Sequence, residues 1–225
     1  MSTAFEKAVA AIERHGVLLL YPVGNKPDPR SLWSALHPRS VMRWAWDESA
    51  DPRVVALWHL RTALSKSKRV VYGKWLTGRA TFFSRDAFVA LLATLRAQFD
   101  LRADLGGTAR RLLDVLLDDS PLATGALRVA AGLEGRLHEA ELARGMKKLW
   151  SRLLVAGAGE EEEGGFPSLA VGATELVHED LWDRAATLGP EDEARVAALA
   201  EASPAVARGL KRLRASLRPL DDEAP

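Results

Sequence analysis

Apolar residues recur at helical spacing along most of this chain, and these stretches predict its helices. Phe5, Val9 and Ile12, for example, share one helical face, and Gly16 follows them as a stop signal. A continuous apolar run at 17–23 predicts a buried strand instead. Helices are expected at 3–15, 31–36, 52–65, 86–99, 108–117, 123–131, 137–153, 178–188 and 191–217, the last broken near Pro204.

A basic β-hairpin is predicted between the third and fourth of these helices. Residues 70–75 and 80–84 are rich in β-branched and aromatic side chains, and Leu-Thr-Gly at 76–78 supplies the turn. Cations stand at both ends and in the middle of this segment: Lys68, Arg69, Lys74, Arg79 and Arg85.

The second half of the chain predicts three helices followed by two β-like runs, which is the order of a winged helix-turn-helix. On its third helix, at 137–153, Leu142, Met146 and Leu149 share one side. The opposite side gathers four cations: Arg144, Lys147, Lys148 and Arg152. Such a face suits the major groove of DNA, and the alternative is an ordinary solvated helix surface.

These elements predict an α+β, helix-rich fold built from tandem winged-helix-like modules with short β-hairpins. A polar segment at 100–107 resembles a linker. We therefore expect an N-terminal winged-helix-like region at 1–104 that contains the basic hairpin 69–85, a winged helix-turn-helix at 105–188, and C-terminal helices with a tail at 189–225.

Composition narrows the class of protein. The chain has 225 residues, of which 48% are hydrophobic, so it can bury a substantial core. It has no cysteine and no apolar run long enough to cross a membrane, which favours a cytoplasmic protein without disulfides. The histidines are scattered, and neither His138-Glu139 nor His178-Glu179 has a second histidine at zinc-binding spacing. We expect no metal, no cofactor and no contact with a membrane.

Charge is distributed unevenly although the net charge is only +1. Residues 61–111 contain 11 Lys/Arg and 3 Asp/Glu, a net charge of +8, whereas residues 112–203 contain 8 and 18. A basic block of this size suits a partner with a phosphate backbone, or else it offsets the acidic block beside it. The candidate contacts to nucleic acid are Lys68, Arg69, Lys74, Arg79, Arg85, Arg144, Lys147, Lys148 and Arg152.

An acidic tract is expected at the tip of the second hairpin, within residues 159–165. Its carboxylates would repel a phosphate backbone within a Debye length of about 8 to 10 Å. Either this hairpin points away from DNA, or it binds a basic protein surface through Glu160, Glu161, Glu162 and Glu163.

Tryptophan is abundant in the first third of the chain, where arginine and lysine surround it. Such aromatic residues can stack on unpaired bases, but tryptophan more often packs in a core. Trp44 and Trp46 are the best candidates for exposure, because Arg43 and Asp47 flank them.

The hairpin segment, with Tyr-Gly-Lys-Trp-Leu-Thr-Gly-Arg-Ala-Thr-Phe-Phe-Ser at 72–84, resembles the bacterial winged-helix proteins related to the DNA glycosylase AlkZ. The N-terminal apolar strand and Pro-x-Ser-Leu-Trp at 29–33 stand in the matching order. The resemblance covers about residues 3 to 180 and implies binding to duplex DNA, with damaged or distorted duplexes among the candidates.

The resemblance also implies a catalytic Gln-apolar-Gln or Gln-apolar-Asp motif near the N-terminal strand, and this chain departs from it. Residues 19–23 carry no such pair, and Gln98-Phe99-Asp100 lies after the hairpin instead of before it. We therefore favour a non-catalytic DNA-binding protein and assign no catalytic residue. The alternatives are a glycosylase for alkylated or crosslinked bases that uses Gln98 and Asp100, and a protein-interaction adaptor that uses the acidic tract.

Overall fold

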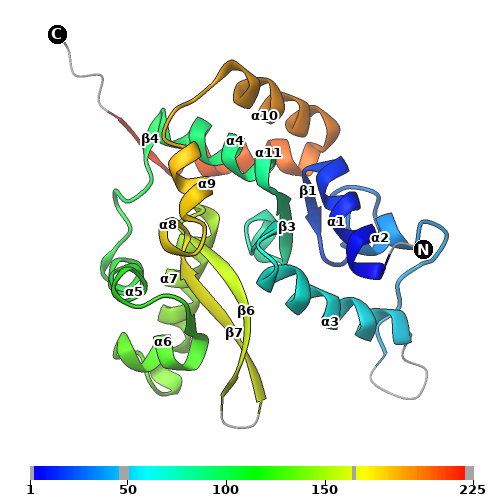
Figure 1. Ribbon diagram of the computed structural model, residues 1–225. Helices are drawn as coiled ribbons and strands as arrows, with labels where there is room; N and C mark the ends of the chain where they lie inside the picture. Colours follow the sequence, from blue (N-terminus) through cyan, green and yellow to red (C-terminus); the bar gives the residue numbers. More distant parts are fainter. Residues whose placement is uncertain (1–2, 46–50, 164–165, 221–225) are drawn as a thin grey trace.

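The computed structural model describes residues 3–45, 51–163 and 166–220 (Figure 1). Helices dominate, and antiparallel strands form one larger sheet, so the predicted α+β, helix-rich class is confirmed. The helices are α1 (Ala4–His15), α2 (Leu32–Leu36), α3 (Pro52–Lys66), α4 (Arg85–Arg96), α5 (Gly107–Asp118), α6 (Thr124–Ala130), α7 (Glu139–Ser151), α8 (Thr174–Val177), α9 (Glu179–Arg184), α10 (Pro190–Ala202) and α11 (Pro204–Arg214).

Local signals set several of these helix boundaries. The Thr3 side chain accepts a hydrogen bond from the Glu6 amide at the start of α1, and Gly16 ends that helix with a φ of 73°. Pro204 begins α11 directly after α10 ends, which confirms the break predicted there. None of the described helices is long and apolar enough to cross a membrane.

The sheet joins the two hairpins into one structure. Its order is β1-β3-β2-β6-β7-β5, and neighbouring strands pair antiparallel. The strands are β1 (Val17–Leu19), β2 (Val70–Gly73), β3 (Thr81–Ser84), β5 (Leu122–Ala123), β6 (Val155–Glu163) and β7 (Phe166–Ala173), with β4 (Phe99–Asp100) and β8 (Arg218–Pro219) paired separately. Figure 1 shows α5, α6 and α7 on one side of the β6–β7 hairpin and α3 on the other.

The second hairpin is longer than the sequence pattern predicts. Strand β6 continues from Val155 to Glu163, through residues that we expected to form the tip. A register shift between Gly157 and Gly159 marks a bulge, after which Glu160 pairs with Leu169. The bulge lets the strand resume, so the acidic tract begins inside the sheet.

Gly157 is the point where the two hairpins meet. It pairs with Tyr72 of β2, and a Cβ built on Gly157 would lie only 2.2 Å from the Tyr72 ring. The ring itself is buried between Phe82 and Trp150 and cannot move aside freely. A residue without a side chain is therefore required at this position.

We predict that Gly157→Ala lowers the free energy of unfolding by about 1–3 kcal/mol, because the added methyl group overpacks the junction. Gly107→Ala is the matched control: a Cβ at that helical position meets no atom within 4 Å, so its effect should stay within about 0.5 kcal/mol. Urea unfolding of both variants measures the difference. Equal effects would show that the close approach at Tyr72 carries no energetic consequence.

His178 is a buried titratable group between α8 and α9. Its side chain contacts the Phe88 ring, and its Nδ1 has no hydrogen-bond partner in the described part of the chain. Burial, which removes the charged form from water, lowers the pKa of His178 from 6.5 to about 4. The native protein therefore resists protonation of this ring.

This shift predicts acid-sensitive folding. Between pH 6.5 and about pH 4 the unfolded chain takes up a proton that the native state excludes, so stability is full above pH 6.5 and falls as the pH falls. From pH 7 to pH 5, the loss due to His178 should be about 2 kcal/mol. Urea unfolding at both pH values should show a smaller loss in His178→Leu, and an equal loss in both proteins would contradict the prediction.

Candidate nucleic-acid interface

The predicted basic hairpin is present, and its turn is fixed from within. Strands β2 and β3 pair from Val70 opposite Ser84 to Gly73 opposite Thr81. The Thr81 hydroxyl donates to the Arg79 carbonyl and accepts from the Leu76 amide, across the short 3₁₀ turn η1 (Leu76–Gly78). This network holds the turn residues in one conformation beside Lys74.

A cleft of about 420 Å³ lies beside this turn. Three segments far apart in sequence line it: the hairpin turn, α7, and α11 with the residues that follow it. Each segment contributes one cation, namely Lys74, Lys147 and Arg212. Among the described residues that line the cleft, none is acidic. The cleft is therefore a concentration of positive charge in a concave surface.

Helix α11, the third segment that lines the cleft, packs closely on the hairpin. Gly209 faces Leu76 and Trp75, and a Cβ on Gly209 would lie 3.4 Å from the Leu76 side chain. Because glycine occupies this position, α11 approaches the turn closely. Arg212, three residues later on the same helix, then reaches the cleft.

The three cations of the cleft have no ion-pair or hydrogen-bond partner within the described ranges. Burial is the main reason why the pKa of Lys74 is lowered, and the positive charge of Arg61 adds to the effect. A bound anion would relieve the cost of holding this ammonium group charged. The cleft thus concentrates positive charge that the ion pairs and hydrogen bonds of the described residues do not balance.

The other predicted hairpin cations lie at the opposite end of the strands. Arg69 pairs with Glu6 at 3.0 Å, and Arg85 pairs with Asp180 while it donates to the Lys68 carbonyl. These contacts direct Arg69 and Arg85 to neighbouring segments. Lys68, Arg69 and Arg85 therefore lie at the far end of the hairpin from Lys74 and Arg79, which flank the turn.

The cations of α7 divide in a similar way. Arg144 and Lys147 are exposed, and only Lys147 lines the cleft. Lys148 donates from Nζ to the Asp104 carbonyl at 2.9 Å. The side of α7 that the helical projection assigns to solvent is thus partly covered by residues 101–104.

Arg152 was wrongly placed on the exposed cationic face by the sequence pattern. Its side chain is only 3% exposed, and its guanidinium donates to the carbonyls of Leu101, at 3.0 Å, and Ala103. The irregular segment 101–104 leaves carbonyl groups without partners from regular secondary structure, and Arg152 satisfies them. A buried guanidinium with this role is not available to a phosphate backbone.

The tryptophans divide between core and surface. Trp33 and Trp75 are buried, and Trp44 is 53% exposed, as expected for each. Trp58 was expected in the core, but it is 46% exposed. Arg61 covers one face of its ring, with the guanidinium carbon 3.9 Å from the ring centroid. Trp46 lies outside the described residues.

The acidic tract is partly engaged inside the protein. Glu160 forms an ion pair with the buried Arg61 and accepts a hydrogen bond from the Thr62 hydroxyl at 2.8 Å. Glu161 is exposed, and the side chains of Glu162 and Glu163 lie outside the described part of the structure. Glu160 therefore has a structural role, and its carboxylate is not free to bind a protein partner.

Gln98 and Asp100 serve different parts of the structure. The Asp100 carboxylate accepts hydrogen bonds from the amides of Arg102, at 2.7 Å, and Ala103, at 3.1 Å. Gln98 lines a separate pocket between helices α4, α10 and α11. Neither residue lines the cationic cleft. In the described residues, no group of three or more histidine or acidic side chains is arranged to hold a metal ion.

Arg212 and Ser151 line the cleft but were not among the predicted contacts. The sequence does contain a signal for Arg212, since cations recur through residues 208–218. That run does not reveal which of its cations faces the hairpin. The selection follows from the packing of α11, which sequence spacing does not specify.

Residues 2–205 match the family model described as AlkZ related. No curated protein and no solved structure matches the chain. The matched region covers most of the chain and includes the hairpin and α7, whereas Arg212 lies beyond it. The chain therefore belongs to the AlkZ-related family, as the resemblance of its hairpin indicated.

Proposed function

We propose that this protein binds duplex DNA through the cleft formed by the hairpin turn, α7 and α11. The supporting observation is the convergence of Lys74, Lys147 and Arg212 on one concave surface, where they have no ion-pair partner in the described ranges. Cations arranged in this way neutralise phosphates and release their counterions, which supplies most of the affinity of non-specific DNA binding. Membership of the AlkZ-related family is consistent with this function.

We further propose that residues 105–188 act as a winged helix-turn-helix. Its elements follow in the order α5, β5, α6, α7, β6 and β7, and β5 pairs with β7. In that motif the third helix approaches DNA, and here the third helix is α7, which carries Lys147 into the cleft. Arg144 and Arg79 are exposed, and they belong to α7 and to the end of the hairpin turn, the segments that supply Lys147 and Lys74 to the cleft.

A bent or damaged duplex suits this concave site better than a straight one. Bending a duplex so that its phosphates enter a cleft costs deformation energy. A duplex that is already distorted needs less further deformation, so this cost is smaller. We therefore expect tighter binding to duplexes that contain a mismatch, a nick or a bulky lesion.

Binding is favoured over catalysis at this cleft. The described residues that line it include no carboxylate, histidine or amide side chain to activate or orient a water molecule. The glycosylase alternative would use Gln98 and Asp100. Neither residue lines the cleft that contains Lys74, Lys147 and Arg212. The chemistry available in the cleft is the recognition of negative charge.

The variant Lys74→Gln/Lys147→Gln/Arg212→Gln should bind duplex DNA at least about ten-fold more weakly at low salt. The slope of log K against log salt should fall by about 2 to 3, since each phosphate contact contributes about 0.9. Fluorescence anisotropy with a labelled duplex, titrated between roughly 50 and 200 mM salt, measures both quantities.

Lys7→Gln/Lys26→Gln/Arg195→Gln is the control, because it removes the same total charge from exposed positions outside the cleft. It should retain nearly all of the affinity and the slope. Equal losses in the two triple variants would mean that overall charge, not the cleft, determines binding. An absence of duplex binding by the unaltered protein at low salt would refute the function itself.

A further inference from the structure

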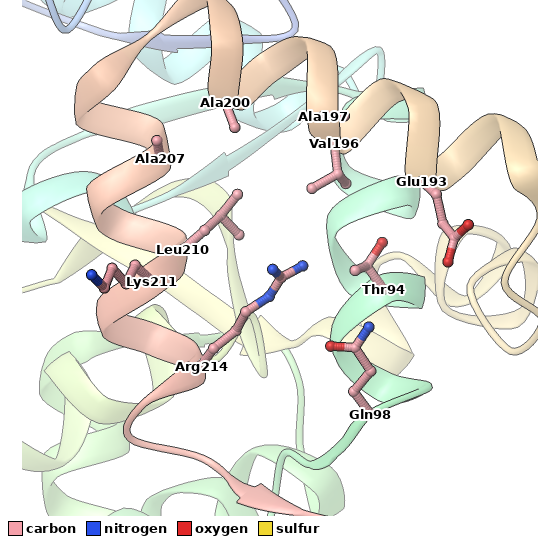
Figure 2. A pocket seen from close by; sticks show the side chains of 10 residues that line it. All are labelled: Thr94, Gln98, Glu193, Val196, Ala197, Ala200, Ala207, Leu210, Lys211 and Arg214. Atoms are coloured by element: carbon pink, nitrogen blue, oxygen red, sulfur yellow. The ribbon is translucent and has the colours of Figure 1, made fainter.

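A second pocket, of about 440 Å³, lies on the other side of α11 (Figure 2). Helices α4, α10 and α11 enclose it, and Gln98 stands at its edge just after α4. Ala197, Ala200 and Ala207 form part of its wall. Because these facing side chains are small, helices α10 and α11 leave a space beside α4 that larger residues would fill.

Two polar groups in this pocket have no hydrogen-bond partner among the described residues. Thr94 is 4% exposed, and its hydroxyl makes no hydrogen bond in the described structure, although a helical threonine can bond to a carbonyl one turn earlier. The Nε of Arg214 is also buried without a partner. Leaving such groups unsatisfied is costly, and a ligand that accepts hydrogen bonds would remove the cost.

Figure 2 shows how these groups are directed. The Arg214 guanidinium extends from α11 across the pocket toward α4, where the Thr94 hydroxyl and the Gln98 amide lie. Lys211 points away from this space. The polar end of the pocket thus offers a guanidinium, a hydroxyl and an amide, all able to donate hydrogen bonds.

The rest of the pocket is apolar and contains one acidic residue. Val196 and Leu210, both almost fully buried, line the space together with the alanines. Glu193 also lines it and disfavours a ligand with more than one negative charge. A ligand that fits this combination has one singly charged oxyanion and a small apolar body. The planar fork of a guanidinium matches a carboxylate in particular.

We propose that this pocket binds a small monocarboxylate, with its oxyanion on Arg214, Thr94 and Gln98 and its apolar body against Val196 and Leu210. The site is distinct from the DNA-binding cleft, because Arg212 faces the cleft whereas Arg214 faces the pocket. It does not depend on the proposed DNA-binding function.

Benzoate is a suitable probe, and the chain itself supplies the reporter. The sequence contains one glutamine, Gln98, and one asparagine, Asn25, so the ¹⁵N spectrum holds only two side-chain carboxamide signals. Benzoate should shift the Gln98 signal saturably, with a Kd on the order of 1 mM, as expected for a ligand of its size. The Asn25 signal should not move, because that side chain binds the Met42 backbone elsewhere.

Arg214→Met should weaken benzoate binding at least ten-fold, and Thr94→Val should weaken it several-fold while the fold is kept, since valine has nearly the same shape. Arg208→Met removes the same charge from the exposed face of α11 and should leave the Kd unchanged. Benzamide, which lacks the negative charge, and phenyl phosphate, which can carry two, should both bind more weakly than benzoate to the unaltered protein.

Three results would overturn the proposal: no saturable shift of Gln98 at tens of millimolar benzoate, an unchanged Kd in Thr94→Val and Arg214→Met, or benzamide binding as tightly as benzoate. Tighter binding of phenyl phosphate would overturn the choice of a monocarboxylate. The benzamide and phenyl phosphate comparisons use the unaltered protein, so they decide the question even if Arg214→Met fails to fold.

Discussion

The junction between β2 and β6 determines how the two hairpins of this protein are placed relative to each other. At this point the Tyr72 ring lies over Gly157, and the buried Arg61 of α3 forms an ion pair with Glu160 two residues beyond the bulge. Removing one partner of a buried pair leaves an uncompensated charge, at a cost of about 3–5 kcal/mol. Because the junction fixes the end of β2 against the β6 side of the sheet, Lys74 is positioned beside α7 and its Lys147.

Charge pairing across the fold explains which cations remain available. Several arginines of the basic block 61–111 pair with acids of the block 112–203: Arg61 with Glu160, Arg85 with Asp180, and Arg102 with Glu175. Part of the uneven charge along the sequence therefore becomes long-range ion pairs once the chain is folded. The more exposed of these pairs, Arg85–Asp180 and Arg102–Glu175, contribute little stability, but all three pairs remove their arginines from contact with a ligand. The cations of the cleft differ because no acid lies among the described residues that line it.

Local sequence signals predicted the elements better than their contacts. The first hairpin, the order of three helices and a hairpin, and the break at Pro204 all depend on neighbouring residues, and the sequence predicted each of them. The second hairpin is nevertheless longer than predicted. Arg152 was misplaced because the helical projection cannot show that residues 101–104 cover that side of α7. The sequence predicted only some of the cations of the cleft, because it does not show which distant segments come together. Lys74 and Lys147 were recognised as cations, but their meeting with Arg212 depends on segments far apart in sequence.

Helix α11 connects these observations, since it forms a wall of both the cleft and the pocket. Residues two positions apart on a helix point about 200° apart, so Arg212 and Arg214 necessarily face different sides. Between them, Leu213 is buried and anchors the helix, and Gly209 sets its close approach to the hairpin turn. A run of cations that reads in the sequence as a single basic patch is therefore divided by the helical geometry into two sites. One is a strongly positive cleft, and the other is a small pocket with an apolar wall; among the described residues, the first is lined by no acid and the second by one carboxylate. This difference in surroundings, not the number of cations, leads us to assign an extended polyanion to the first and a small monoanion to the second.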